Sequence, residues 1–341
     1  MIHRLYLVLS LLAAVPAVLW ATPQNGVDSA ELVQSEPAPI SIGIIGLDTS
    51  HVVAFTKLIN YPGATGDLAT MRVTAAYPGG TDLATSRDRI QGFTEQVAEM
   101  GVEIVDSIDD LLQKVDVVLL ESVDGRVHLE QARLVIAAGK PMFIDKPLAA
   151  SLVDAILIDD LARESGVPWF SSSSLRQGAS IPEGIGDVVG CSAWGPAKLE
   201  GTHPDLFWYG IHGVETLFTV MGPGCESVTR VQTSGSEFVT GIWPRGRVGT
   251  FRGIREGKSG YGAMVFGTKG IGARTKYAGY GALVNEIARF FRTHELPVPN
   301  AETLEIYAFM EAADESKRRG GVPVTLASVM QRARAEAAER R

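Results

Sequence analysis

The stretch Ile40-Ser-Ile-Gly-Ile-Ile-Gly46-Leu-Asp-Thr-Ser-His51 decides the fold. A short apolar run ends at Gly46, and after a turn the apolar residues recur at helical spacing as far as Ile59. A strand, a tight turn and a helix in this order open the doubly wound domains that bind dinucleotides. The usual phosphate-binding pattern there is G-x-G-x-x-G. In this chain Gly46 keeps the first glycine, while Asp48 and His51 stand at the other two positions.

The segments that follow alternate between strand and helix. Strands are expected at residues 71–77, 102–105, 115–120 and 141–144, with helices at 88–100 and 128–138 between them. Residues 115–120 are almost continuously apolar, which is typical of a central parallel strand that is covered on both faces. The alternation predicts a parallel sheet flanked by helices.

Beyond Pro168 the pattern changes to short strands separated by glycine-containing turns, after a helix predicted at residues 152–165. Antiparallel pairs are expected for residues 238–243 with 248–252 and 261–266 with 271–274, and helices for 282–293 and 301–319. We therefore predict an α/β protein: an N-terminal Rossmann-like doubly wound parallel sheet, then a C-terminal α/β domain with an open, largely antiparallel sheet. The predicted segments are a signal peptide (1–21), a linker (22–39), a Rossmann-like nucleotide-binding domain (40–150), a substrate and oligomerisation domain (151–326) and a charged helical tail (327–341).

The first residues have the pattern of a signal peptide. A short positive start ends at Arg4, residues 5–20 are apolar, and Ala21 offers a small residue for cleavage. The apolar segment is short for a membrane span, and residues 22–39 carry acids but no Lys or Arg. We predict an exported protein, periplasmic or extracellular, with no stable membrane span in the mature chain. An uncleaved anchor at residues 5–20 is the alternative.

Composition excludes some classes of partner. The net charge is −8, and no cluster of Lys and Arg precedes the C-terminal end, which argues against nucleic acid as a partner. The chain has only two cysteines, Cys191 and Cys225, which either pair after export or remain two unpaired small hydrophobic residues. Neither has the spacing of a zinc ligand, and no metal site is predicted. An open sheet face is compatible with a homo-oligomer.

A motif at the end of the fifth predicted strand, Phe143-Ile-Asp-Lys-Pro147, carries a family resemblance. With His128 upstream and the Rossmann-like start, it resembles the Gfo/Idh/MocA family (glucose–fructose oxidoreductase, inositol dehydrogenase and relatives), whose strand-end signature is Glu-Lys-Pro. A second family signature ends in a histidine followed three residues later by an acid, as His212 and Glu215 are here. The resemblance runs from about residue 40 to 326.

This resemblance implies an NAD(P)-dependent dehydrogenase or oxidoreductase that acts on a sugar, cyclitol or related polyol by hydride transfer. Lys146 would orient and polarise the reacting hydroxyl group, and His212 would take its proton as hydride leaves. The alternatives are a salt-bridged strand-end lysine and a core histidine. The other predicted site residues are Gly46, Asp48, Thr49, Ser50, Glu121 and Ser122, with Lys146, for the cofactor NAD or NADP, and Arg176, His203, Trp208 and Tyr209 for the substrate.

Three positions depart from the family pattern. Asp48 replaces a glycine, and a carboxylate about 5 Å from a phosphate costs roughly 3 kcal/mol, or about two decades of affinity. The cost disappears if Asp48 turns away, for instance to cap the helix. Residues 77–80, Tyr-Pro-Gly-Gly, replace the acid expected to bind the adenosine ribose, and Trp208 stands where the family commonly has a catalytic aspartate.

Two other functions remain open. One is an exported sugar- or polyol-binding protein with the same fold and no nucleotide. The other is a redox-neutral enzyme, such as a glycoside-cleaving one, that retains its nucleotide through each turnover. Export is what makes a dehydrogenase difficult and leaves these alternatives open. A chain that crosses the membrane unfolded carries no cofactor, and free nicotinamide nucleotide is scarce outside the cytoplasm. Arg4 stands alone, without the second arginine of a twin-arginine signal.

Overall fold

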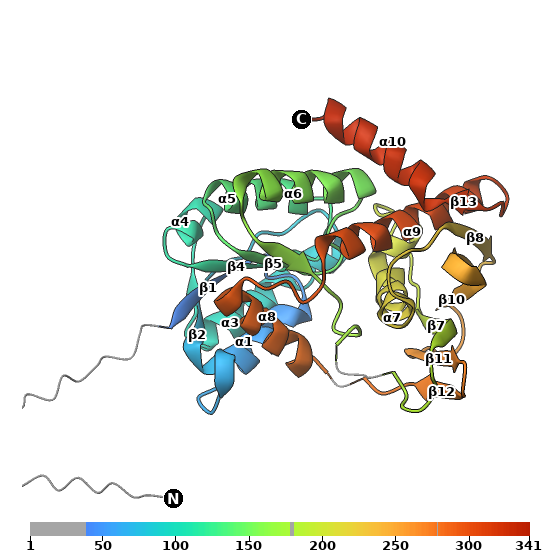
Figure 1. Ribbon diagram of the computed structural model, residues 1–341. Coiled ribbons are helices and arrows are strands. Elements are labelled where there is room, and N and C mark those ends of the chain that lie inside the picture. Colours follow the sequence, from blue (N-terminus) through green and yellow to red (C-terminus); the bar gives the residue numbers. More distant parts are fainter. Residues whose placement is uncertain (1–38, 178–180, 278) are drawn as a thin grey trace, which may run out of the picture. The chain divides into compact units, whose positions relative to one another are not determined.

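The computed structural model describes residues 39–177, 181–277 and 279–341. The predicted signal peptide, and the predicted linker except for its last residue, lie outside these ranges. Residues 38–341 form one compact unit, and its strands form two sheets (Figure 1). In the part of the chain that is described, no helix is both long and apolar enough to cross a membrane.

The first sheet has six strands, all parallel, in the order β3-β2-β1-β4-β5-β6. These strands are β1 (Ile40–Ile45), β2 (Met71–Tyr77), β3 (Glu103–Ile104), β4 (Val117–Leu120), β5 (Met142–Ile144) and β6 (Trp169–Ser171). The predicted doubly wound parallel sheet is confirmed. In this strand order the ligand crevice lies outside the carboxyl ends of the strands, where the order reverses between β1 and β4.

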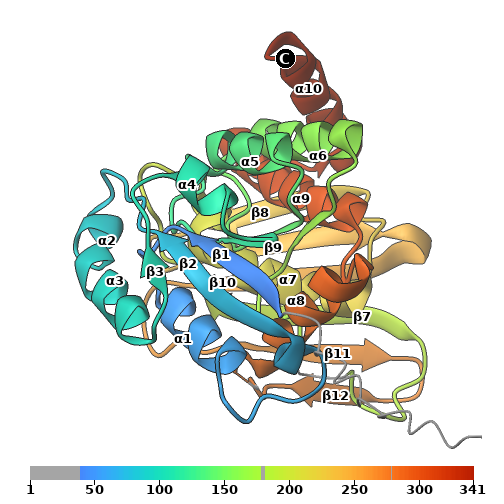
Figure 2. The same cartoon turned by 90° about the vertical axis from the view of Figure 1, so that its left-hand side faces the viewer.

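Helices cover both faces of this sheet (Figure 2). One face carries α1 (Ser50–Ile59), α3 (Ile90–Glu99) and α8 (Gly281–Thr293), and the other carries α4 (Ile108–Leu112), α5 (His128–Ala137) and α6 (Leu152–Ser165). The apolar run of β4 follows from this layering. Val118 and Leu120 enter the core with α5 and α6, Val117 enters the core with α1 and α8, and all of β4 is buried.

The second sheet is mixed, in the order β12-β11-β7-β10-β9-β8-β13, and only β7 and β10 pair in parallel. Its strands are β7 (Val188–Pro196), β8 (Ser227–Gln232), β9 (Ser236–Trp243), β10 (Arg247–Ile254), β11 (Gly262–Gly267), β12 (Ile271–Arg274) and β13 (Val324–Thr325). Both predicted antiparallel pairs, β9 with β10 and β11 with β12, are confirmed.

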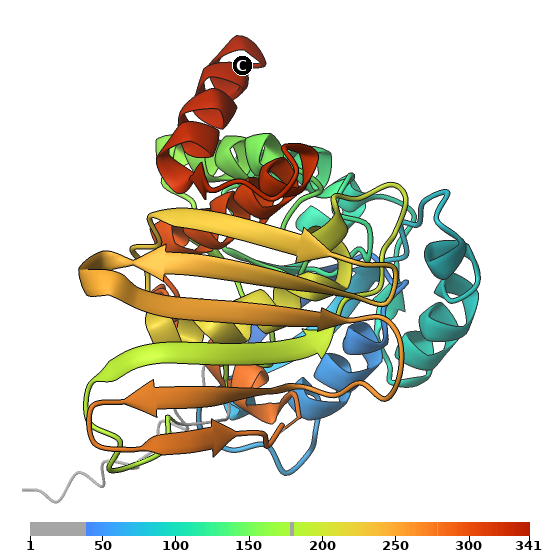
Figure 3. The same cartoon turned by 90° about the vertical axis from the view of Figure 1, so that its right-hand side faces the viewer.

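Helices α7 (Ile211–Met221) and α9 (Asn300–Arg318) pack against one face of the second sheet, and Figure 3 views the other, open face. Phe238 and Ile242 of β9 are exposed, because they alternate with the buried Val239 and Trp243. The homo-oligomer stays a prediction. Cys191 and Cys225 are both buried and both free.

Two elements beyond residue 150 belong with the first sheet: strand β6 and helix α8. The domain boundary that the sequence predicts at residue 150 stays a prediction. The last helix, α10 (Leu326–Glu339), packs on α6 through buried residues such as Val329 and Ala333. The final two arginines extend this contact, Arg340 to Asp154 and Arg341 to Glu164, each at 2.7 Å.

Candidate active site

Strand β1 ends in a turn that requires glycine. Gly46 has φ 91°, and a Cβ atom at this position would collide with the backbone and side chain of Ser122. Its N–H donates to the carbonyl of Tyr77 (2.9 Å), and the N–H of Leu47 donates to the carbonyl of Pro78 (2.8 Å). The turn thus brings the ends of β1, β2 and β4 together at the point where the strand order reverses.

Asp48, at the second glycine position, turns away from the helix that follows. Its Oδ1 accepts from the backbone N–H of Val123 (2.8 Å) and its Oδ2 from the hydroxyl of Ser86 (2.6 Å). The carboxyl group is fully buried, and this burial raises its pKa although both hydrogen bonds oppose the shift. The N-cap of α1 is Thr49, whose Oγ1 accepts from the N–H of His51 (3.4 Å). The suggestion that Asp48 caps the helix is therefore wrong, and its charge does not face the helix N-terminus.

His51, at the third glycine position, is held by a carboxylate at the end of another strand of the first sheet, β5. Its Nδ1 lies 2.7 Å from Oδ2 of Asp145, which directly follows β5. The imidazole stacks on Phe55 with ring centroids 5.4 Å apart, and Tyr280 meets it edge-on at 4.8 Å. Because a carboxylate oxygen can only accept, Nδ1 carries the proton, and the neutral ring has its lone pair on Nε2.

The two buried acids beside His51, Asp145 and Glu121, have pKa values shifted in opposite directions. Burial alone would raise the pKa of Asp145, but the positive charge that His51 carries in its protonated form and that of Lys146 outweigh it and lower that pKa to about 2. Lys146 Nζ lies 3.8 Å from the same carboxylate oxygen. Glu121, after β4, is fully buried, and burial together with the charge of Asp145 raises its pKa well above the usual value. Asp145 is therefore the stronger acid of the pair, and burial favours the protonated form of Glu121.

The same cluster holds the atoms that a metal ion would need. Possible ligand atoms of His51, Glu121 and Asp145 lie within 4.8 Å of one another. However, His51 Nδ1 is already bonded to Asp145, and the Lys146 ammonium group balances that carboxylate without an ion. The predicted absence of a metal site stays a prediction.

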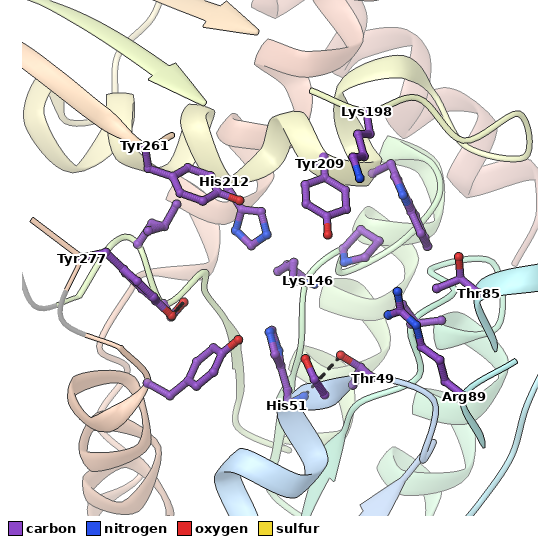
Figure 4. A pocket seen from close by; sticks show the side chains of 17 residues that line it. Thr49, His51, Thr85, Arg89, Lys146, Lys198, Tyr209, His212, Tyr261 and Tyr277 are labelled. Carbon is purple, nitrogen blue, oxygen red and sulfur yellow. Dashed lines mark hydrogen bonds between the residues drawn. The ribbon is translucent and has the colours of Figure 1, made fainter. Parts of the chain in front are cut away.

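A cavity of about 310 Å³ opens beside this cluster (Figure 4). The N-terminus of α1, with Thr49 and Ser50, forms one part of its wall. Among the residues described, the lining contains three cations, Arg89, Lys146 and Lys198, and no carboxylate. Aromatic side chains make up much of the remainder: Trp208, Tyr209, Tyr261, Tyr277 and Tyr280. Such a cavity suits a ligand with negative charge and with a ring that can stack.

His212 enters the cavity from the first turn of α7, after a π-helical turn at Leu206–Gly210. Its Nδ1 lies 2.7 Å from the hydroxyl oxygen of Ser173. Burial, with the charges of Lys146 and His51, lowers its pKa well below the usual value, so that the ring is neutral at pH 7. Figure 4 shows His212 and Lys146 directed toward the same space.

Several predicted site residues meet at this cavity, and others do not line it. The lining includes Thr49, Ser50, Lys146, Trp208, Tyr209 and His212. Gly46, Asp48, Glu121 and Ser122 are buried outside the lining, and the Ser122 hydroxyl donates to Gln131 Oε1 (2.9 Å). Their contacts with a cofactor stay predictions.

Two of the predicted substrate residues have other partners. Arg176 Nε donates to Glu215 (2.6 Å) and its Nη1 to Glu302 (2.7 Å). His203 is buried, with Nδ1 3.0 Å from the Thr202 hydroxyl and Nε2 3.4 Å from Asp124 Oδ1. Their contacts with substrate stay untested, and neither side chain lines the cavity.

Sequence reasoning missed several lining residues. For His51 the sequence offered a signal: a histidine stands where the phosphate-binding turn usually has its third glycine. Arg89, Lys198, Tyr261, Tyr277 and Tyr280 had none, since they come from separate segments that only the folded chain brings together.

The fold and the site together define a class of protein. Its first half is a Rossmann-type sheet with a cavity at the carboxyl ends of the strands, and its second half is built on an open sheet that also contributes to the cavity. The Gfo/Idh/MocA family model, described as an oxidoreductase family with an NAD-binding Rossmann fold, matches residues 66–172. This match confirms the resemblance that the Lys-Pro motif indicates. No curated protein sequence matches the chain.

Solved structures agree with this fold. The scyllo-inositol dehydrogenase from Lactobacillus casei, with bound NAD(H) and scyllo-inositol, has a TM-score of 0.66 at 16% identity, over 85% of this chain and 99% of that one. The UDP-N-acetylglucosamine 3-dehydrogenase from Acidithiobacillus ferrooxidans has a TM-score of 0.64 at 16% identity, over 82% and 99%. At these identities the likeness shows the fold.

The residues present fit the phosphates of a nicotinamide nucleotide. Helix α1 presents its N-terminal turn to the cavity at Thr49 and Ser50, and such a turn binds anions through backbone N–H groups and the helix dipole. Arg89 faces the same space, whereas the Asp48 carboxylate is turned toward Val123 and Ser86. The electrostatic cost expected from Asp48 therefore does not apply in this arrangement.

Proposed function

We propose that the chain is an NAD(P)-dependent oxidoreductase that removes hydride from a sugar, cyclitol or related polyol. The observation that carries this proposal is the meeting of Lys146 and His212, 66 residues apart in the sequence, at one cavity that the N-terminus of α1 also lines. The match of residues 66–172 to an NAD-binding oxidoreductase family supports it. So do the fold relatives, which are dehydrogenases of an inositol and of a nucleotide sugar.

The chain's own residues divide the work of binding. Thr49, Ser50 and Arg89 hold the phosphates, and the bound nicotinamide supplies the hydride acceptor. The aromatic side chains Trp208 and Tyr209 offer flat surfaces to the apolar face of a sugar or cyclitol ring. The cavity of about 310 Å³ has room for the substrate and the nicotinamide end of the cofactor, and their binding excludes water from it, which strengthens every electrostatic interaction inside it.

Lys146 acts on the reacting hydroxyl group. Its ammonium group, 3.8 Å from Asp145 and mostly buried, donates a hydrogen bond to the hydroxyl oxygen and stabilises the negative charge that grows there. An imidazole of the cavity takes the hydroxyl proton, a role that the family resemblance assigns to His212.

Nucleotide binding is the first test. Ser50 is exposed at the first position of α1 and lines the cavity, so Ser50→Glu places a negative charge beside the proposed phosphates. We expect it to weaken the binding of NAD or NADP by about two decades, from a repulsion of roughly 3 kcal/mol at about 5 Å. Ser50→Gln is the control of matched size. Because Ser50 contributes its backbone N–H to the phosphates, this change of side chain should alter the dissociation constant by less than about threefold.

Isothermal titration of the apo protein measures these constants. Because an acid in the first turn favours a helix, Ser50→Glu should not unfold the chain. Equal affinities of the Glu and Gln variants, or no binding by the wild type, would contradict a nucleotide site at the N-terminus of α1.

One observation favours a second candidate, a sugar- or polyol-binding protein without nucleotide. Residues 77–80, Tyr-Pro-Gly-Gly, replace the acid that would hold the adenosine ribose directly at the end of β2. The acid further along this loop, Asp82, is paired instead with Arg126, which also bonds Asp124 (2.7 Å) in the loop after β4. Sugar-dependent thermal stabilisation with no nucleotide binding would support this candidate. An exported location, from the signal peptide predicted at residues 1–21, is proposed for either function.

A further inference from the structure

The cavity holds two imidazoles, and their partners differ. His212 contacts the neutral hydroxyl group of Ser173 at 2.7 Å and lies near the Lys146 ammonium group. His51 contacts the Asp145 carboxylate at 2.7 Å. An imidazole that takes up a proton becomes a cation, and a carboxylate on its other nitrogen stabilises that cation far more than a hydroxyl group does. By this comparison His51 is the better proton acceptor.

The geometry of His51 suits this role. Asp145 fixes the Nδ1–H tautomer, Phe55 and Tyr280 fix the plane of the ring, and the residue lines the cavity. Nε2 has no hydrogen-bond partner in the part of the chain described, so it is available to a ligand. Figure 4 shows the His51 ring pointing into the cavity beneath Lys146.

No neighbouring acid or histidine among the described residues replaces Asp145 as the hydrogen-bond partner of the His51 ring. Burial and the charge of Asp145 raise the pKa of the neighbouring Glu121, whereas the pKa of Asp145 is lowered, so Asp145 supplies the negative charge next to the ring. His128, also buried near this cluster, has both ring nitrogens on backbone carbonyls, those of Ser122 (2.7 Å) and Leu148 (3.1 Å). His128 is therefore not available to the cavity.

We propose that His51, positioned by Asp145, and not His212, takes the proton of the substrate hydroxyl group. This inference rests on the proposed function. As the C–H bond breaks, its electron pair leaves as hydride for the oxidised nicotinamide. The hydroxyl group on the same carbon loses its proton to His51 Nε2, and the electron pair of the broken O–H bond forms the second bond of the C=O group. Asp145 keeps accepting the Nδ1 proton throughout and is not itself protonated. His212 is then a substrate-positioning residue.

The tautomer of His51 is a test that requires no substrate. Nuclear magnetic resonance of the apo protein with ¹⁵N-labelled histidine distinguishes protonated from unprotonated ring nitrogens, and the spectrum of His51→Gln assigns the residue. We expect a protonated Nδ1 and an unprotonated Nε2 in the neutral ring, with the preference lost in Asp145→Asn. A protonated Nε2 in the wild type would overturn the proposal.

Kinetics provide the second test, with myo-inositol, scyllo-inositol and D-glucose as probes. His51→Gln should lower kcat about 10²- to 10³-fold with KM within about threefold, and Asp145→Asn should lower it at least about tenfold. Added imidazole should restore part of the kcat of His51→Ala, which a structural role would not allow. His294→Asn, at the exposed end of α8 and with φ 59°, is the control.

The two possible failures are distinct. If the wild type reduces nucleotide and His51→Gln does so at the same rate, the assignment of His51 is wrong and the proposed function stands. If the wild type turns over none of the probes, the proposed function fails, and the assignment fails with it whatever the tautomer.

Discussion

Replacement of Lys146 by methionine is expected to lower kcat about 10²- to 10³-fold, because a donor aimed at the developing oxyanion contributes that much. Methionine keeps the length and the packing of the side chain and removes only the ammonium group. Lys146 is partly buried, and its side chain lies beside Asp145 in the cavity. The affinity for NAD or NADP should change by less than about threefold, since Thr49, Ser50 and Arg89 hold the phosphates.

Lys57→Met is the matched control, because Lys57 is exposed in the last turn of α1 and does not line the cavity. Steady-state reduction of nucleotide gives kcat, and titration calorimetry gives the dissociation constant. A kcat within about threefold of the wild type would remove Lys146 from its assigned role. A parallel loss of nucleotide binding would reassign it to the cofactor.

Replacement of Arg230 by methionine is expected to cost about 3–5 kcal/mol of unfolding free energy, the usual result when one partner of a buried ion pair is removed. Arg230 is almost fully buried in β8. Its guanidinium group contacts three acids, Asp205 (2.6 Å), Glu237 and Asp314. Without the guanidinium group these carboxylates are left close together, and two of them are buried. Urea unfolding followed by tryptophan fluorescence measures the loss.

The pH dependence of this effect follows from Asp314. Burial, with the neighbouring acids, raises its pKa to about 7 although Arg230 opposes the shift. A folded-state pKa above the unfolded value favours folding at low pH, so this contribution is lost as the pH rises from about 4 through about 7. Arg230→Met should therefore be more destabilising at about pH 8 than at about pH 5.

The double variant Arg230→Met with Asp314→Asn is the control for this account. It removes one of the charges that the single variant leaves unpaired, so it should recover part of the lost stability at about pH 8 and lessen the pH dependence. A single-variant loss below about 1 kcal/mol, or one that is equal at both pH values, would contradict the electrostatic explanation.

Much of the fold could be predicted because its local patterns are unambiguous. A strand covered on both faces must be apolar throughout, which is why residues 115–120 identified the centre of the sheet. Serine is a preferred N-cap residue, and Ser151 and Ser107 each cap a helix, accepting from Asp154 N–H (2.9 Å) and Asp110 N–H (3.0 Å). Helix α8 could be predicted as a helix but not placed. Its apolar face fits either sheet by pattern, and only the fold brings it back to the first one.

The site could be predicted only in part, because its residues are distant in sequence. The Lys-Pro motif located Lys146, and the histidine-acid spacing located His212. Nothing in the sequence joins His51 to Asp145, which are 94 residues apart, or indicates that Arg176 pairs with Glu215. The direction of Asp48 was also undetermined, because it depends on the loops that supply Val123 and Ser86.

The most direct test of hydride transfer in the Lys146–His212 cavity is to follow a deuterium label. Myo-inositol, scyllo-inositol and D-glucose, each deuterated on the ring carbons, are mixed with the wild type and NAD or NADP, and the nucleotide is analysed by mass spectrometry. We expect reduced nucleotide that carries one deuterium from at least one of these probes. Nucleotide that stays oxidised with every probe, or that is reduced without deuterium, would contradict the proposed function.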